Sequence, residues 1–340
     1  MKNLLIIFLV ILIGCNPKKN NEEGKPESRL DEFQPHIELL DKKLEEILDP
    51  STKVEIIAEG FDWAEGPIWI DGLGLLFSDI PPNNIYLWTK ENGDRLYLTP
   101  SGYTGSSPRG GEVGSNGLLL DSENNLILCQ HGDRRIARLT SSLDGPKPEY
   151  ETIVDNYVGK KLNSPNDACF NKNGDLYFTD PPYGLEKNVD DPLKELNFQG
   201  VYKFSKSGEM SLLTDKMSRP NGIAFSPDEK TLYVANSDPE KAIWMSFRLN
   251  NYGLIESEDV FFDATSFVGE EAGLPDGLKV DKWGNIFAAG PGGVWVFDSQ
   301  GRVLGKIKTG QATSNCAIGN NGKVLYITAD MYVMKVELKS

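Results

Sequence analysis

The chain has 340 residues, of which 39% are hydrophobic and 10% aromatic, enough for a large core in one big β domain or two smaller domains. Its formal net charge of −15 argues against a nucleic acid as partner, because a protein that binds a polyanion needs a basic face. An acidic surface is the simplest explanation of this charge, and the alternative is that some of the carboxylates hold a cation.

The first fifteen residues are typical of a secretory signal. A lysine at position 2 precedes an apolar run over 4–13, which is too short to span a bilayer as a helix. The last four residues of this stretch, Leu-Ile-Gly-Cys, resemble a bacterial lipobox, which predicts a lipoprotein signal peptide and lipidation of Cys15. Residues 16–33 are mostly polar and predict a flexible tether. We therefore expect a protein held at the bacterial cell envelope by its lipid alone; an ordinary signal with an incidental cysteine is the alternative.

A short helix is expected at the start of the globular part, residues 34–340. In the segment 35–48, the apolar residues Ile37, Leu40 and Leu44 recur at helical spacing, which predicts an amphipathic helix packed on the domain. Beyond it, short β-rich runs alternate with Gly, Pro, Asn and Asp. The remainder of the chain is therefore predicted to be all-β.

One sequence pattern recurs six times in the all-β part. Each copy has a small residue or proline, a polar residue, an apolar strand, a polar turn and a second β-rich strand, as in "PNGIAFSPDEKTLYVAN". The copies start at residues 64, 115, 165, 220, 275 and 314, at intervals of 51, 50, 55, 55 and 39 residues. Most copies continue with a third β-rich run, and a fourth often follows. Four strands in about 40–50 residues are typical of a β-propeller blade, so six copies predict a six-bladed β-propeller. A β-sandwich or barrel, the second choice, does not explain the recurring pattern.

The polar residue of each copy marks a candidate binding site. In a propeller the first strand of each blade lines the central channel, so the residue just before it lies at one mouth of that channel. The six residues at this position are Glu65, Asn116, Asn166, Asn221, Asp276 and Asn315. Asn and Asp also favour such turns because they cap nearby backbone groups, which is the competing explanation for any single one of them.

Two carboxylates with several amide oxygens form a ligand set for a hard divalent cation. Ca²⁺ takes about six to eight oxygen ligands and tolerates loose geometry, so it is the first candidate. Mg²⁺ or Mn²⁺ suits an octahedral oxygen site, whereas Zn²⁺ prefers nitrogen or sulfur, and the chain has only two histidines, His36 and His131. A cation with open positions is a Lewis acid toward a carbonyl group. The sequence carries neither a nucleotide-binding glycine motif nor a serine-nucleophile elbow.

At these residues the sequence resembles the senescence marker protein/gluconolactonase/luciferin-regenerating enzyme family. The resemblance extends from about Ile56 to the C-terminus and rests on "AEGPIW", "SPNDACF…LYFTDPPYG", "RPNGIAFSPDEKTLYVANS" and "PDGLKVDKWGNIF" in this order. It implies a six-bladed propeller that binds one divalent cation and hydrolyses a lactone, often that of a sugar acid such as gluconolactone.

The resemblance also implies roles for individual residues. Glu65, Asn221 and Asp276 match the metal ligands, and Asn166 would join them or contact the substrate. Asp276 also matches the residue proposed to move a proton between water and the leaving group. Asn116 is predicted to contact the substrate at the same mouth.

One departure from the family concerns the substrate. Characterised animal members carry an arginine two residues before the equivalent of Asn166, and Ser164 replaces it here. The substrate is therefore not implied to be the same sugar lactone. His131, in "LCQHGDRR", is a candidate auxiliary acid/base or substrate ligand, with a structural role in a turn as the alternative. Tyr183, in "DPPYG", is a candidate wall of the substrate pocket.

The first functional hypothesis is a Ca²⁺-dependent lactonase whose partner is a small-molecule lactone. A second is a non-catalytic propeller that binds a sugar or a partner protein, because this fold often serves as an interaction platform. A third is a metal-dependent hydrolase of another ester. The two carboxylates in the predicted ring favour an enzyme, because a propeller that only binds a partner has no need of them.

Overall fold

A computed structural model describes residues 33–339 of the chain. The chain divides into two units, residues 1–33 and 34–340, and the second contains all the elements below. The predicted signal peptide (1–15), the lipidated Cys15 and the tether (16–33) lie outside the described residues, apart from Phe33. Among the described residues, no helix is both long enough and apolar enough to cross a bilayer.

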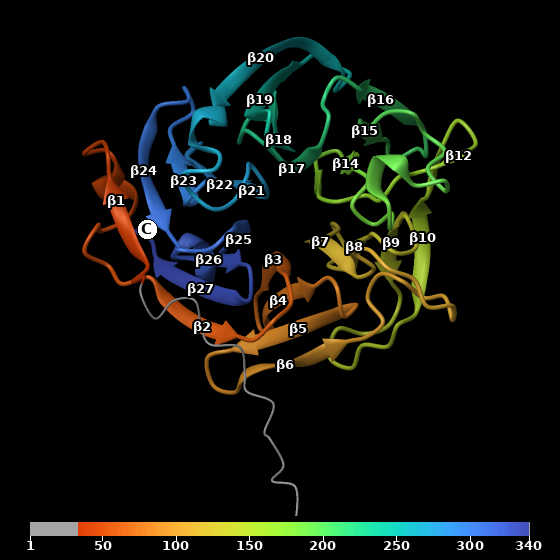
Figure 1. Ribbon diagram of the computed structural model, residues 1–340, viewed down its shortest axis with the longest axis horizontal. Helices are drawn as coiled ribbons and strands as arrows, with labels where there is room; N and C mark the ends of the chain where they lie inside the picture. Colours follow the sequence, from red (N-terminus) through yellow and green to blue (C-terminus); the bar gives the residue numbers. More distant parts are fainter. Residues whose placement is uncertain (1–32, 340) are drawn as a thin grey trace, which may run out of the picture. The chain divides into compact units, whose positions relative to one another are not determined.

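The second unit is a six-bladed β-propeller, as predicted (Figure 1). Six antiparallel sheets are arranged in a ring, and the six strands that open the repeated pattern are the innermost strands of the six blades. Each blade packs between two neighbours, so its central strands are covered on both faces; the strands Leu126–Gln130 and Leu176–Asp180, for example, are buried at every residue.

Blades one to four each follow the chain order from the innermost strand outwards. Blade one has β3 (Ala64–Ile70), β4 (Gly74–Asp79), β5 (Asn84–Thr89) and β6 (Gly93–Leu98). Blade two has β7 (Ser115–Leu120), β8 (Leu126–Gln130), β9 (Arg135–Leu139) and β10 (Tyr150–Val154). Blade three has β13 (Ala168–Phe170), β14 (Leu176–Asp180), β15 (Gly200–Phe204) and β16 (Met210–Thr214). Blade four has β17 (Pro220–Phe225), β18 (Thr231–Asp238), β19 (Lys241–Leu249) and β20 (Ile255–Asp263).

The last two blades are completed by strands from the N-terminal part of the globular unit. Blade five has β21 (Leu278–Val280), β22 (Ile286–Gly290), β23 (Gly293–Phe297) and β24 (Val303–Lys308), with β1 (His36–Leu39) as a fifth, outermost strand. Blade six has β25 (Thr313–Gly319), β26 (Val324–Ala329) and β27 (Tyr332–Glu337), with β2 (Glu55–Glu59) as its fourth strand. The remaining elements are a two-stranded ribbon, β11 (Asn156–Tyr157) and β12 (Lys160–Lys161), and three 3₁₀ turns, η1 (Asn188–Asp190), η2 (Thr265–Phe267) and η3 (Asn320–Gly322).

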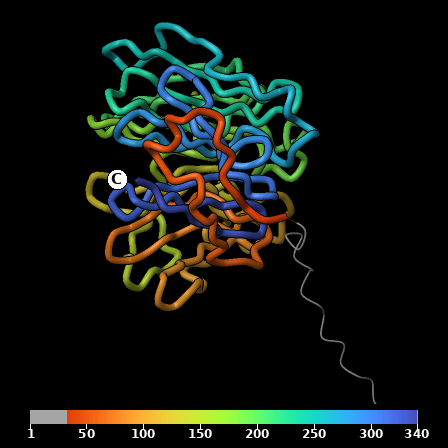
Figure 2. Tube along the Cα trace, turned by 90° about the vertical axis from the view of Figure 1, so that its left-hand side faces the viewer, coloured from red at the N-terminus to blue at the C-terminus, as the bar shows by residue number. Residues whose placement is uncertain are grey.

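The helix predicted over 35–48 is confirmed only in its last turn, α1 (Leu44–Ile47). The preceding residues form β1, which pairs antiparallel with the outer edge of blade five, Ile37 opposite Ile307. That edge offers unpaired backbone groups, and Gly305 leaves room there, since a Cβ at this position would lie 2.4 Å from the carbonyl oxygen of Glu38. In the side view of Figure 2 this segment, in red, runs along the outside of the blue C-terminal strands. The helical spacing of the apolar residues was therefore overridden by an available sheet edge.

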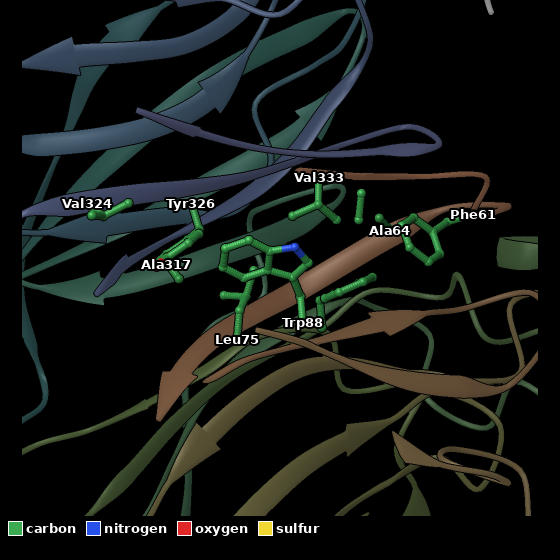
Figure 3. Packing of buried hydrophobic residues seen from close by; sticks show 10 residues of the cluster. Phe61, Ala64, Leu75, Trp88, Ala317, Val324, Tyr326 and Val333 are labelled. Atoms are coloured by element: carbon green, nitrogen blue, oxygen red, sulfur yellow. The ribbon is translucent and has the colours of Figure 1, made fainter. Parts of the chain in front are cut away.

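The core lies between blades, as the contact of blades six and one shows (Figure 3). Trp88 of blade one packs with Leu75, Tyr326 and Val333 in a cluster of buried side chains. Trp69 stacks on Tyr326 of the neighbouring blade, with ring centroids 5.1 Å apart and an interplanar angle of 4°. Large aromatic side chains contribute strongly to such contacts, so this packing stabilises the junction of blades six and one.

Candidate metal and substrate site

The ring residues lie where the innermost strands depart from regular pairing. In blade one the register of β3 against β4 shifts between Glu65 and Ile68, and blades two and four show a similar shift at the start of their inner strands. In blades three and five, Asn166 and Asp276 come just before the paired strand begins. In a regular ladder each side chain lies on one face of the sheet. A bulge or a strand end changes that direction, so the ring residues need not lie on a face of their blade.

A glycine after the ring residue lets neighbouring inner strands approach closely. A Cβ on Gly66 would lie 2.0 Å from the carbonyl oxygen of Asn116, and a Cβ on Gly222 would lie 2.4 Å from that of Asp276. Gly66 also has a φ of +51°, in the left-handed region that side chains disfavour. The recurring pair of a polar residue and a glycine thus has a packing reason as well as a chemical one.

Five of the six ring residues face one cavity of about 470 Å³. Its lining includes the predicted residues Glu65, Asn116, Asn166, Asn221, Asp276 and Tyr183, and also Trp63, Glu112, Arg219, Ser237 and Glu271. Ring side chains from five consecutive blades therefore converge, although they are spread over more than half of the chain. The two predicted residues that do not line the cavity are Asn315 and His131.

Four ring oxygens lack a partner within residues 33–339 and are available to a bound cation or to a ligand. Among the residues that the structure describes, no hydrogen-bond donor reaches the buried Oδ1 atoms of Asn116, Asn166, Asn221 and Asp276. A buried oxygen without a donor is costly, and a cation would satisfy several at once. Between residues 33 and 339 no group of three His, Cys, Asp or Glu side chains is arranged so that it could hold a metal ion, so a cation here would depend on the amides. Oxygen-only ligation with amides suits Ca²⁺ better than Zn²⁺.

The two ring carboxyl groups are costly to ionise. Burial raises the pKa of Glu65 to about 8, and the negative charges of Asp167 and Glu112 add to this, although hydrogen bonds from Gly66 and Asn315 oppose it. Burial, followed by the charge of Glu65, also raises the pKa of Asp276 well above its usual range. A divalent cation between them would offset both costs.

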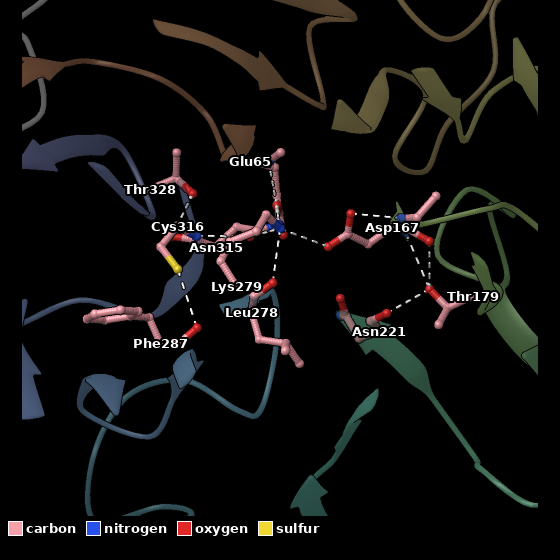
Figure 4. A network of polar contacts seen from close by, with 12 residues as sticks. Glu65, Asp167, Thr179, Asn221, Leu278, Lys279, Phe287, Asn315, Cys316 and Thr328 are labelled. Atoms are coloured by element: carbon pink, nitrogen blue, oxygen red, sulfur yellow. Dashed lines mark hydrogen bonds and ion pairs between the residues drawn. The ribbon is translucent and has the colours of Figure 1, made fainter. Parts of the chain in front are cut away.

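Asn315, the sixth ring residue, supports Glu65 (Figure 4). Its Nδ2 donates a hydrogen bond of 3.1 Å to Glu65 Oε2, and its Oδ1 accepts one of 3.3 Å from Lys279 Nζ. Lys279 also lies 3.4 Å from Asp167 Oδ2. The amide oxygen of Asn315 is thus already occupied, and its role is to fix the carboxylate beside it. Asp167 follows a ring residue at a position where four of the other five blades have glycine, and its charge is matched by Lys279 from two blades away.

His131 lies behind the cavity wall. It is fully buried, and its Nδ1 is 3.2 Å from Oε2 of Glu112, which does line the cavity. The contact lacks the direction of a hydrogen bond, since neither ring nitrogen has a hydrogen-bond partner within residues 33–339. The structure therefore places His131 where it can act on a ligand only through Glu112, and its catalytic role stays a prediction.

Sequence reasoning missed Glu112 and Arg219. Glu112 follows a glycine-rich run, four residues before Asn116, and Arg219 lies two residues before Asn221. Nearness to a ring residue was the available signal. Ser164, where the sequence departs from animal relatives, is buried, and its hydroxyl donates to the carbonyl oxygen of Pro181 at 2.6 Å. It makes a structural contact rather than replacing an arginine.

The fold and the site together define a class: six-bladed propellers in which the inner strands present amide and carboxylate oxygens to a single cavity. The profile of the SMP-30/Gluconolactonase/LRE-like region matches residues 63–330, and the chain belongs to this family. The resemblance drawn from the sequence motifs is therefore confirmed.

Individual relatives agree with this assignment. A gluconolactonase of Zymomonas mobilis is 41% identical over 330 residues, which covers 95% of this chain and 89% of the relative. The solved structure of a gluconolactonase of Xanthomonas campestris matches with a TM-score of 0.76 and 29% identity, covering 89% of this chain and 95% of that one. Regucalcin of Agrobacterium tumefaciens, described as a calcium-binding protein, shares the fold with a TM-score of 0.63 and 18% identity over 85% of this chain and 95% of its own.

Proposed function

We propose that this protein hydrolyses the lactone of a sugar acid, such as gluconolactone, with the help of a divalent cation, Ca²⁺ being the first candidate. The observation that carries the proposal is a set of four buried ring oxygens, three from amides and one from Asp276, that have no donor within residues 33–339. The buried carboxylate of Glu65 lies at the same cavity. The names of the relatives point to the same substrate class, and the calcium-binding relative with the same fold supports the choice of cation.

The ring residues divide between the cation and the substrate. Glu65, Asn166, Asn221 and Asp276 would hold the cation, which when bound supplies a Lewis acid for a carbonyl oxygen. Asn116 would orient the lactone, with Tyr183 as the wall of the cavity. The support of Glu65 by Asn315 keeps the ligand set fixed before substrate arrives, and such preorganisation lowers the cost of reaching the transition state.

The chain also supplies groups that can transfer a proton from the attacking water to the leaving oxygen. Asp276 lines the cavity and its Oδ1 has no donor among the described residues, so its carboxylate can accept the proton of the water that attacks the carbonyl carbon. As the bond between that carbon and the ring oxygen breaks, the same proton returns to the ring oxygen, which leaves as a hydroxyl group. Glu112, with His131 behind it, is a second acceptor on the cavity wall. The product is an open hydroxy acid.

The test is the hydrolysis of a panel of aldonolactones by purified protein, before and after a chelator, with Ca²⁺, Mg²⁺, Mn²⁺ or Zn²⁺ then added back. We expect turnover that the chelator removes and Ca²⁺ restores. Full activity after exhaustive chelation would contradict the role of the cation. Sugar binding without turnover of any lactone would favour the non-catalytic propeller, and turnover of other esters alone would favour the third hypothesis.

We propose separately that the protein is attached to the cell envelope. The lipobox-like sequence that ends at Cys15 supports attachment of the protein to the cell envelope by a lipid. Labelling of cells with a radioactive fatty acid checks this, with Cys15→Ser as the control that should not incorporate label. Equal labelling of both proteins would contradict the anchor.

A further inference from the structure

Arg219 presents a guanidinium to the cavity that the chain itself does not use. Its backbone is fixed, because its N–H donates to Asn236 Oδ1 at 2.9 Å and its carbonyl oxygen accepts from the N–H of Ser237 at 2.9 Å. Its side chain lines the cavity and is half-buried. Within residues 33–339 the guanidinium makes no hydrogen bond or ion pair, so its five N–H donors are free, although its charge acts on the nearby Asp238. The backbone of Arg219 is therefore anchored beside the cavity, and the free donors of its side chain lie in the cavity lining.

With a divalent cation bound, the positive and negative charges around the cavity would be equal in number, so Arg219 is not needed to neutralise a charge on the ligand. A divalent cation would cancel the charges of Glu65 and Asp276. Glu271 is already paired, since Lys306 Nζ lies 3.2 Å from its Oε2 and Lys308 contacts its other oxygen. What remains is two positive charges, Arg219 and the surplus of the two lysines, against two negative ones, Glu112 and Asp238. Asp238 lies near Arg219, and a hydrogen bond from Ser218 and the charge of Arg219 both lower its pKa. A cavity built for an anion would carry a surplus of cations, so this balance suits a neutral ligand that both accepts and donates hydrogen bonds.

We propose that Arg219 recognises hydroxyl groups of the lactone away from the reacting carbonyl, and that it thereby sets a preference for polyhydroxylated lactones over unsubstituted ones. The inference deepens the proposed function and rests on it. Arg219 stands beside Ser237 and Tyr183 in the cavity lining. Hydrogen bonds to a charged donor contribute more than neutral ones, and a site built for hydroxyls discriminates strongly against an analogue that lacks them.

The experiment measures binding first, so that its result does not depend on turnover. Ca²⁺-loaded wild-type protein, Arg219→Gln and Arg248→Gln are titrated by calorimetry with D-gluconate and with 5-hydroxyvalerate. Both ligands are unbranched acids with a carboxylate at one end and a hydroxyl group at the other. Only gluconate also carries hydroxyl groups on the carbons in between. Arg248 is the matched control, because it lies on the outer part of the same blade, is largely exposed and pairs with Glu256 at 3.5 Å.

We expect Arg219→Gln to weaken gluconate binding by about tenfold or more while changing 5-hydroxyvalerate binding less than about twofold. Arg248→Gln should match the wild type with both ligands. Equal weakening of both ligands would show that Arg219 binds the carboxylate or supports the cation site, and unchanged binding of gluconate would show that it binds nothing; either result overturns the proposal.

Kinetics give the second readout. With D-glucono-1,5-lactone and δ-valerolactone as substrates, Arg219→Gln should lower kcat/KM about tenfold or more for the first and leave the second within about twofold. A parallel fall for both substrates would contradict the proposal. If the wild type hydrolyses no lactone, the proposed function is contradicted instead. Calorimetry would then still show whether Arg219 binds hydroxyl groups.

Discussion

At the scale of single residues, Asp276 has two proposed roles, as a ligand of the cation and as a proton acceptor. It is a ring carboxylate with a raised pKa, and its Oδ1 has no donor among the described residues. As a cation ligand it must be ionised, and as a proton acceptor it must be basic. Burial next to a second carboxylate, Glu65, makes Asp276 basic, whereas a bound cation would keep it ionised. A substitution that keeps the shape and removes the charge therefore separates its function from its packing.

Asp276→Asn should lower kcat by about 100-fold or more, because general acid–base catalysis contributes on this order and a cation ligand is weakened at the same time. The unfolding temperature in the presence of chelator should fall by little or rise, since a buried carboxylate is replaced by an amide. Initial rates and thermal unfolding check both statements. Asp259→Asn, on the exposed outer strand β20, is the control and should behave as the wild type. Retention of full activity by the Asp276→Asn variant would remove Asp276 from the mechanism.

The raised pKa of Glu65 predicts how pH affects stability. In the cation-free protein this pKa is about 8, against an ordinary value of 4.5. The folded state thus binds a proton that the unfolded state has lost, so this contribution to stability is complete below pH 4.5 and is lost as the pH rises to 8. A cation takes the place of that proton. Added Ca²⁺ should therefore raise the unfolding temperature more at about pH 8 than at about pH 6, and its binding should release protons.

Thermal unfolding with chelator or with Ca²⁺ at the two pH values tests this, and Glu65→Gln serves as the matched control. In that variant the difference between the two pH values should shrink. A Ca²⁺-induced shift that is the same at both pH values in the wild type would show that Glu65 does not exchange its proton for the cation.

At the scale of elements, the inner strands carry most of what could be predicted. Each combines an alternating apolar run with a polar residue and usually a glycine in front, so both the strand and its ring residue can be recognised locally. Arg219 and Glu112 could not be assigned to the cavity in this way, because their direction depends on the path of a connection between blades. Asn315 matches the pattern but differs in role, because Lys279 and Glu65 from other blades occupy its amide.

The glycines of the inner strands make a prediction at this scale. Gly222→Ala places a methyl group 2.4 Å from the carbonyl oxygen of Asp276, between blades four and five. Overpacking of this kind costs about 1–3 kcal/mol, so the unfolding temperature should fall by several degrees and Ca²⁺ affinity should fall with it, because the ring is widened. Gly145→Ala is the control, since no atom lies within 4 Å of its added Cβ. Equal effects of the two substitutions would mean that the inner strands tolerate separation.

At the scale of the whole molecule, the ring is closed by pairing between the two ends of the propeller. Strand β2 pairs with β27, Ala58 opposite Val333, and so completes blade six. Its residue Ile57 also accepts a hydrogen bond of 3.0 Å from Trp88 Nε1 of blade one. Local sequence patterns cannot reveal this pairing, because its two strands lie at opposite ends of the globular unit. The same holds for β1 on blade five, which local spacing assigned to a helix.

Closure by β2 predicts different outcomes for two truncations. A chain that begins at Pro50 loses β1 and α1 but keeps β2, and it should unfold cooperatively at a moderately lower temperature. A chain that begins at Gly60 loses β2 as well. It leaves the edge of β27 unpaired and uncovers Trp88, which should cost roughly 3–5 kcal/mol in lost hydrogen bonds and apolar burial. Exposed edges also promote association, so this chain should elute as larger species in size-exclusion chromatography. If both chains unfold at the same denaturant concentration and remain equally dispersed, the sixth blade does not need its N-terminal strand, and the cavity at the axis is held by the other five.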